Sequence, residues 1–124
     1  AEGQEEPFRA YGSLVRAGIN VGMGMDYCCG EEAFYLDMLQ MFHEQAEEKR
    51  AELVALYEAA NRTDYAIKVH ALKSTSLTIG AEGLSAQAKA LEQAGKNGDV
   101  EYIRENHPLL LQMYGEVCES IADL

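Results

Sequence analysis

The stretch VHALKSTSLTIG, residues 69–80, places a histidine and a lysine about one helical turn apart, at positions 70 and 73. Near pH 7 much of a solvated imidazole is neutral, and its unprotonated nitrogen is a competent nucleophile. The Lys73 ammonium would bring a positive charge toward an anion held by that ring, and phosphate is an anion that lysine binds as a point charge. The pattern therefore indicates that His70 can hold a phosphoryl group.

The helix that must carry these residues is predicted from Thr63 or Asp64, which can cap it, to about residue 80. On a helical wheel the apolar stripe of this segment consists of Tyr65, Val69, Leu72, Ser76 and Ile79. His70 lies about 140° from the centre of that stripe at 100° per residue, so we expect its imidazole to face water.

The residues that share the histidine's side of the helix favour an accessible site. Ala66 and Ser74, one turn before and after His70, are small and leave the ring open. Ile67 and Leu77 are apolar on a side that should be polar, which is typical of a docking surface. The alternative is that Ile67 and Leu77 pack beneath the N-terminal helices.

The stretch HALKSTSLTIGA resembles the signature of histidine-containing phosphotransfer (HPt) domains, the intermediates of two-component phosphorelays. The family pattern is a histidine, a hydrophobic residue two positions on, lysine three on, a small residue four on and glycine ten on. These positions are matched by His70, Leu72, Lys73, Ser74 and Gly80. GINVGMGMDYCCGEEAFYLDML also resembles the family's entry segment, and the likeness covers roughly residues 18–124. Two departures are Ser74, where glycine is commoner, and Pro108 in the last helix.

The resemblance implies that the Nε2 atom of His70 accepts phosphate from a receiver-domain aspartate and donates it to another. Lys73 would balance the phosphate charge, and Gly80 would permit close helix packing. Glu92 stands where related domains carry a polar side chain, so it is a candidate to accept a hydrogen bond from Nδ1–H of His70. Without the resemblance, Glu92 would be interpreted as an ordinary surface glutamate.

The implied partners are receiver domains of response regulators or hybrid sensor kinases. Those receivers would hold the Mg²⁺ that the reaction needs, so we expect no metal site or cofactor in this chain. The acidic composition, with a formal net charge of -11, disfavours nucleic acids and anionic membranes as partners. We expect Lys68, Lys73 and Lys89 to gather near His70 and make that region locally basic.

The composition indicates an all-α protein. The 124 residues suffice for one domain, and Leu, Ala, Glu, Gln and Met dominate without clear alternating apolar runs. We predict an antiparallel four-helix bundle with one or two short N-terminal helices, in which residues 1–7 are frayed and 8–124 form a single domain. The short helices are expected near residues 8–17 and after Asn20. The long ones are expected at about 31–60 and 64–80, within 81–99 with GKNG as the C-terminal stop, and from about 100 onward.

Several other side chains are assigned to the core or the surface. Helical spacing places Phe34, Met38, Met41 and Phe42 on one face of the first long helix, and Val100 and His107 on the inner face of the last. Pro108 is expected to kink or restart that last helix. The three cysteines are interpreted as reduced thiols.

The expected function is therefore that of a monomeric cytoplasmic phosphotransfer intermediate, either free-standing or part of a membrane-bound hybrid sensor kinase. No nucleotide-binding motif accompanies His70 in the sequence, so we expect a carrier and not an autonomous kinase. The alternative is a non-catalytic helical interaction module. A dimerising histidine kinase bundle is disfavoured because Ala71, and not an acidic residue, directly follows the histidine.

Overall fold

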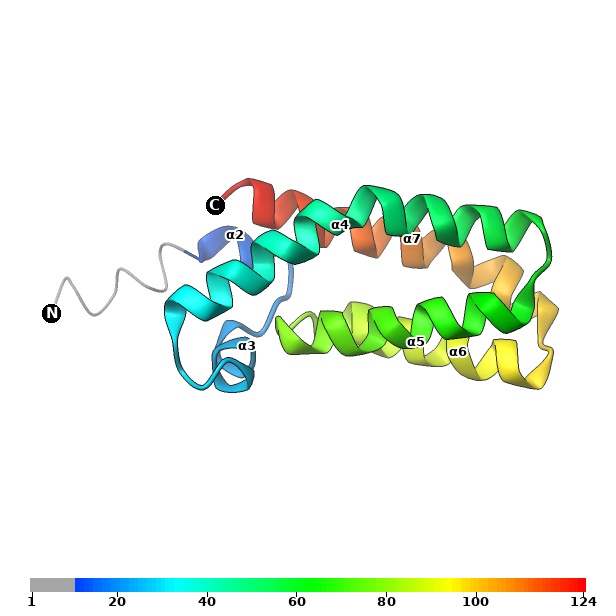
Figure 1. The fold of residues 1–124 in the computed structure, drawn as a ribbon, viewed down its shortest axis with the longest axis horizontal. Coiled ribbons are helices and arrows are strands. Elements are labelled where there is room, and N and C mark those ends of the chain that lie inside the picture. The colour runs from blue at the N-terminus through cyan, green and yellow to red at the C-terminus, as the bar shows by residue number, and fades with distance from the viewer. Residues whose placement is uncertain (1–10) are drawn as a thin grey trace, which may run out of the picture.

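The computed structural model describes residues 11–124, and this part of the chain is helical with no strand. The expected frayed segment 1–7 and the start of the helix expected at 8–17 lie outside the described residues. Six helices follow one another along the chain (Figure 1): α2 (Gly12–Arg16), α3 (Val21–Tyr27), α4 (Glu32–Glu58), α5 (Arg62–Thr78), α6 (Glu82–Asn97) and α7 (Val100–Ala122).

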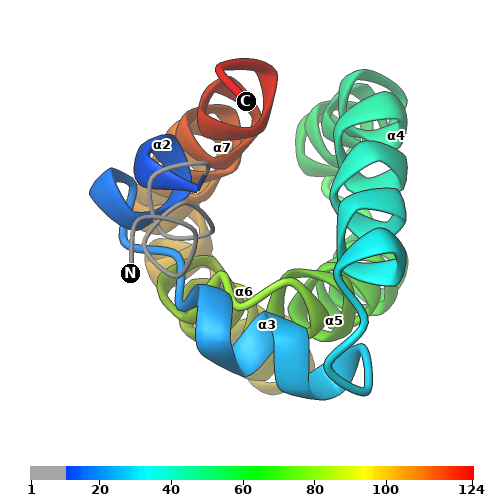
Figure 2. The same cartoon turned by 90° about the vertical axis from the view of Figure 1, so that its left-hand side faces the viewer.

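The four long helices form the predicted antiparallel bundle. Short turns connect them, and in the ring of neighbours α4 contacts α5, α5 contacts α6, α6 contacts α7 and α7 contacts α4. Figure 2 looks along this arrangement, with α5 and α6 side by side between α4 and α7. The pair α5–α6 has the most extensive contact. The short helix α2 packs on α7, and α3 packs at the end of α5.

The helices begin where the sequence supplies acceptors for their free N–H groups. Asn20 and Asp99 cap α3 and α7 through their side chains, as predicted. The cap of α5 is different: the Asn61 side chain accepts from the backbone N–H of Asp64 at 3.2 Å. The prediction of Thr63 or Asp64 as the cap is therefore wrong, because the helix starts one residue before Thr63.

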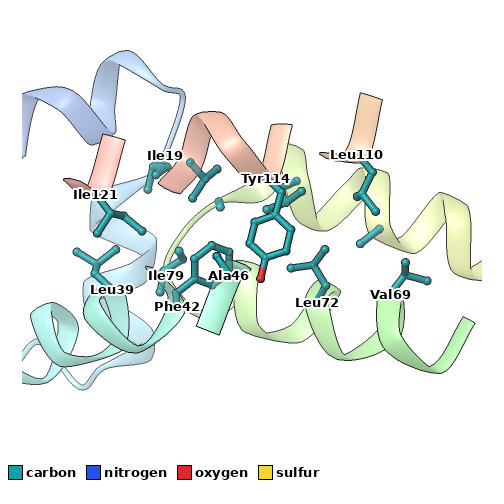
Figure 3. Packing of buried hydrophobic residues seen from close by; sticks show 14 of the residues in the cluster. Ile19, Leu39, Phe42, Ala46, Val69, Leu72, Ile79, Leu110, Tyr114 and Ile121 are labelled. Carbon is teal, nitrogen blue, oxygen red and sulfur yellow. The ribbon is translucent and has the colours of Figure 1, made fainter. Parts of the chain in front are cut away.

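The core lies between the long helices, and its buried residues include Leu39 and Phe42 of α4, Leu72 of α5 and Tyr114 of α7 (Figure 3). The predicted stripe of α5 is buried throughout, from Tyr65 to Ile79. The face predicted for α4 is partly wrong, since Phe34 and Met41 are exposed and Tyr35 and Leu39 are buried instead. Apolar residues occur on several sides of this 27-residue helix, so spacing alone does not identify its inner face.

The last helix also differs from expectation. Val100 is exposed, and α7 continues through Pro108 as one element, so it does not restart there, while the kink stays a prediction. Pro108 and Arg104 both lie on the exposed side, where water can hydrogen-bond the carbonyl that proline leaves without a donor. His107 is buried as predicted: Nδ1 lies 2.8 Å from the Tyr65 hydroxyl, and the ring stacks on Tyr57 at a centroid distance of 4.2 Å.

Gly80 fixes the junction between α5 and α3. Its φ of 86° is left-handed, and its carbonyl accepts a 2.8 Å hydrogen bond from the Asn20 N–H. A Cβ at this position would lie 2.0 Å from the Asn20 carbonyl oxygen, so only glycine allows this approach. The end of the helix that carries His70 is thereby held against α3.

Candidate functional site

His70 projects outward from the middle of α5. Because Val69 and Leu72 on either side point into the core, the helix turns residue 70 toward solvent. Its side chain is 57% exposed, as the wheel predicted. An imidazole placed in this way can be reached by a large partner.

Close packing of α6 against α5 brings Glu92 beneath the histidine. A Cβ added at Gly95 would lie 3.1 Å from the Cβ of Ala66, so the absence of a side chain at Gly95 lets the two helices approach tightly. Glu92, three residues before Gly95, then faces α5 and is only 4% exposed. The interpretation of Glu92 as an ordinary surface glutamate is therefore wrong.

The Glu92 carboxylate is contacted by three nitrogen-bearing side chains. Its Oε2 lies 2.5 Å from Nδ1 of His70 and 3.3 Å from Nζ of Lys96, and its Oε1 accepts a 3.0 Å hydrogen bond from Nζ of Lys73. Burial by itself would raise the pKa of Glu92. The hydrogen bonds from Lys73, His70 and Lys96 outweigh that effect and lower the pKa to about 2.

The ionisation of Glu92 determines how the neutral imidazole is oriented. An ionised carboxylate can only accept hydrogen bonds, so the Nδ1 atom of His70 must carry the proton that it shares with Oε2. In the neutral ring the lone pair then lies on Nε2. The contact fixes both the tautomer and the direction of the Nε2 lone pair.

A cavity of about 490 Å³ opens beside the ring, between Ile67 on α5 and Gly95 and Lys96 on α6. His70 and Glu92 contribute to its wall. The space is open and is bounded by an apolar side chain on one side and a cation on the other. A phosphoryl-sized anion therefore has room next to the imidazole.

The remaining predicted site residues divide into exposed and buried groups. Ile67 and Ser74 are exposed and Leu77 is half-buried, so they lie on the accessible side of α5 with His70. Ala66 is buried against α6, and Gly80 is buried at the end of α5. Ala66 and Gly80 can contribute packing, but they present little surface to a partner.

The expected cluster of lysines differs in its members. Lys68 turns toward α4, where its Nζ lies 2.9 Å from the Glu52 carboxylate. Lys96, which was not predicted to lie there, takes part in the cluster with Lys73. The i,i+4 spacing between Glu92 and Lys96 was a usable signal, but it gains meaning only once Glu92 is known to be buried.

Within residues 11–124 no group of three or more His, Cys, Asp or Glu side chains is arranged to hold a metal ion. The three cysteines are free thiols. Over the same part of the chain, no helix combines the length and the apolar character needed to cross a membrane.

Comparison with known proteins agrees with this geometry. The model of the Hpt domain family matches residues 37–120, and the chain therefore belongs to that family. The chain is also 28% identical over 98 residues to the phosphorelay intermediate protein rdeA of Dictyostelium discoideum, an alignment that covers 79% of this chain. It spans only 39% of the length of that relative. No solved structure matches the chain significantly.

Proposed function

We propose that this chain is a phosphorelay intermediate that accepts a phosphoryl group on the Nε2 atom of His70 from a receiver-domain aspartyl phosphate and donates it to another receiver. The observation that carries this proposal is the exposed imidazole whose Nδ1 is bound to a buried, ionised carboxylate. Membership of the Hpt domain family and the likeness to a phosphorelay intermediate protein support it.

In the forward step the Nε2 lone pair of His70 attacks the phosphorus of the aspartyl phosphate. An N–P bond forms, the P–O bond breaks, and the aspartate leaves as a carboxylate with the electron pair. The imidazole gains positive charge during the attack, and Glu92, 2.5 Å from Nδ1, stabilises that charge. Donation to the next receiver is the same step in reverse.

Lys73 is the second residue with a proposed role in the transfer. Its side chain is 27% exposed and its ammonium lies 3.0 Å from Oε1 of Glu92, so it lies close to the imidazole on the same side of α5. It would lower the cost of bringing the negative phosphoryl group to the ring. We propose that the chain works as a monomeric carrier without kinase activity of its own, and that Mg²⁺ is bound by the receiver.

The direct test is incubation with phosphorylated receiver domains and Mg²⁺. The wild-type protein should gain phosphate that is labile in acid and stable in base, and His70→Gln should gain none. His43→Gln, which removes an exposed histidine of α4, is the matched control and should label normally. Labelling of the folded His70→Gln protein would refute the assignment, and no labelling of wild type by any of a broad receiver panel would favour the interaction-module alternative.

The role of Glu92 has a test of its own. Glu92→Ala should slow the transfer roughly 100-fold, the order of loss that follows when a reacting group is poorly oriented. An unchanged transfer rate would show that the ring needs no support from this carboxylate.

A further inference from the structure

Glu92 has more cationic neighbours than its charge requires. One carboxylate faces the ammonium groups of both Lys73 and Lys96 in addition to the imidazole. Counting Glu92 as -1 and each lysine as +1, the group carries one net positive charge when His70 is neutral. One of the two lysines is therefore in excess for the unphosphorylated site.

Lys96 is the more weakly held of the two. It shares Oε2 with Nδ1 of His70, which is closer at 2.5 Å, whereas Lys96 lies at 3.3 Å. Lys73 has Oε1 to itself at 3.0 Å. The Lys96 side chain is also 58% exposed, against 27% for Lys73. Because the Lys96 ammonium is on the solvent side and its contact with Oε2 is the longest of the three, that contact can be exchanged for one to another anion.

Lys96 lies beside the space that a phosphoryl group on His70 would enter. It lies in the last turn of α6 and forms part of the wall of the cavity that opens beside His70. A phosphoryl group on Nε2 carries close to two negative charges near neutral pH. The ring that keeps Nδ1–H becomes positively charged, so the net charge of the group changes from +1 to 0. Two negative charges then lie on the phosphoryl oxygens, and a cation near them becomes favourable.

We propose, on the basis of the function proposed above, that Lys96 is a movable phosphate-binding cation. It pairs with Glu92 while His70 is free, and it moves onto the phosphoryl oxygens once Nε2 is phosphorylated. Lys73 stays on Oε1, and the Nδ1–H of His70 keeps Oε2. Lys96 thereby stabilises the phosphorylated state more than the free state and sets how far the transfer equilibrium lies toward this protein.

The test compares wild type with Lys96→Gln, Lys96→Arg and a control, Lys68→Gln. The control removes the same unit of charge from a neighbouring lysine that is paired with Glu52 on the side of α4. Circular dichroism checks that each variant is folded. The first measurement is the equilibrium constant for transfer from a phosphorylated receiver. It should fall about ten-fold in Lys96→Gln, as expected for one charge-assisted hydrogen bond to phosphate, and stay within about two-fold of wild type in the other two variants.

The second measurement separates a direct phosphate contact from a structural effect. Phosphoramidate can phosphorylate His70 without a receiver, and the ³¹P chemical shift then reports ionisation of the phosphoryl group against pH. A nearby ammonium favours the dianion, so this ionisation should move to higher pH in Lys96→Gln and return to the wild-type position in Lys96→Arg. The Lys68→Gln protein should titrate like wild type.

The outcomes are distinguishable from failure of the proposed function. If wild type itself takes up no phosphate on His70, the proposed function fails and this inference falls with it. If wild type is phosphorylated but Lys96→Gln has an unchanged equilibrium constant, Lys96 is only a helix-end lysine and the proposal is wrong. A lower equilibrium constant with an unchanged ³¹P titration would also overturn it, because the effect would then act through Glu92 alone.

Discussion

Replacing Glu92 by glutamine tests the electrostatics of the site without testing phosphate transfer. Glutamine has the same shape and keeps one acceptor oxygen, but it cannot ionise. The pKa of Glu92 lies at about 2 instead of the ordinary 4.5. At 1.36 kcal/mol per pKa unit, this difference makes the ionised carboxylate contribute roughly 3 kcal/mol to the free energy of unfolding near neutral pH.

The sign of the pH dependence follows from the lowered pKa. Above about pH 4.5 the carboxylate is ionised in both the folded and the unfolded chain, and its whole contribution is present. As the pH falls from 4.5 through about 2, the unfolded chain binds the proton first and the contribution is lost. By pH 3 about 2 kcal/mol of it should be gone.

Urea unfolding of wild type and Glu92→Gln at a series of pH values from 6 to 3 measures this loss. Titrating groups that do not contact residue 92 are common to the two proteins, so their contributions cancel in the difference between the two free energies of unfolding. The advantage of wild type over the variant should shrink by about 2 kcal/mol across this range. Glu52→Gln, at an exposed pair with Lys68, should change the corresponding difference by less than about 0.5 kcal/mol.

A constant difference between wild type and Glu92→Gln would contradict the electrostatic reasoning. It would mean that Glu92 ionises like an ordinary carboxyl and is not held by three donors. The assignment of the Nδ1–H tautomer to His70, which depends on an ionised partner at 2.5 Å, would then lose its basis.

Two further predictions concern the supports of the site. Gly80→Ala should lower the free energy of unfolding by more than about 3 kcal/mol, because a left-handed φ and a clash with the Asn20 carbonyl act together. Gly98→Ala is the control: Gly98 has a similar φ but open space around it, so this change should cost about 1 kcal/mol. Equal losses in urea unfolding would show that the clash is relieved by a small movement. Burial lowers the pKa of His107, so its contribution is complete above pH 6.5 and declines as the pH falls. His107→Phe leaves the Tyr65 hydroxyl unpaired, so it should lower the free energy of unfolding by about 1–3 kcal/mol at pH 7 and by less at pH 5, as measured by urea unfolding. A loss of stability that grew on acidification would contradict this reasoning.

The sequence predicted the features that depend on a single helix. The outward direction of His70 follows from the apolar stripe of α5, whose period is fixed by helix geometry. The caps at Asn20 and Asp99 follow from local backbone chemistry in the same way. These predictions needed no knowledge of how one helix lies on another.

The features that escaped prediction depend on the register between helices. The burial of Glu92 depends on the close contact between Ala66 and Gly95, which sets the position of α6 along α5. The same register places Lys96 in the cluster and leaves Lys68 on the far side, facing α4. A helical wheel predicts which side of a helix faces the core but not the position of that helix along its neighbour. The full charge cluster therefore could not be predicted from the sequence.

The described histidines show that environment, and not residue type, assigns the chemistry. His107 is hydrogen-bonded at Nδ1 and oriented, but it is buried and stacked on Tyr57, so no partner can reach it. His43 is exposed on α4. Within residues 11–124, however, only the rings of His70 and His107 have a side-chain hydrogen-bond partner, so no such contact orients the His43 ring. His70 alone among these three combines a fixed Nδ1 with an open Nε2. The nucleophile proposed here therefore depends on one helix to expose the ring and on a second helix to hold its inner nitrogen. The α5–α6 contact is then as important to the proposed chemistry as the histidine itself.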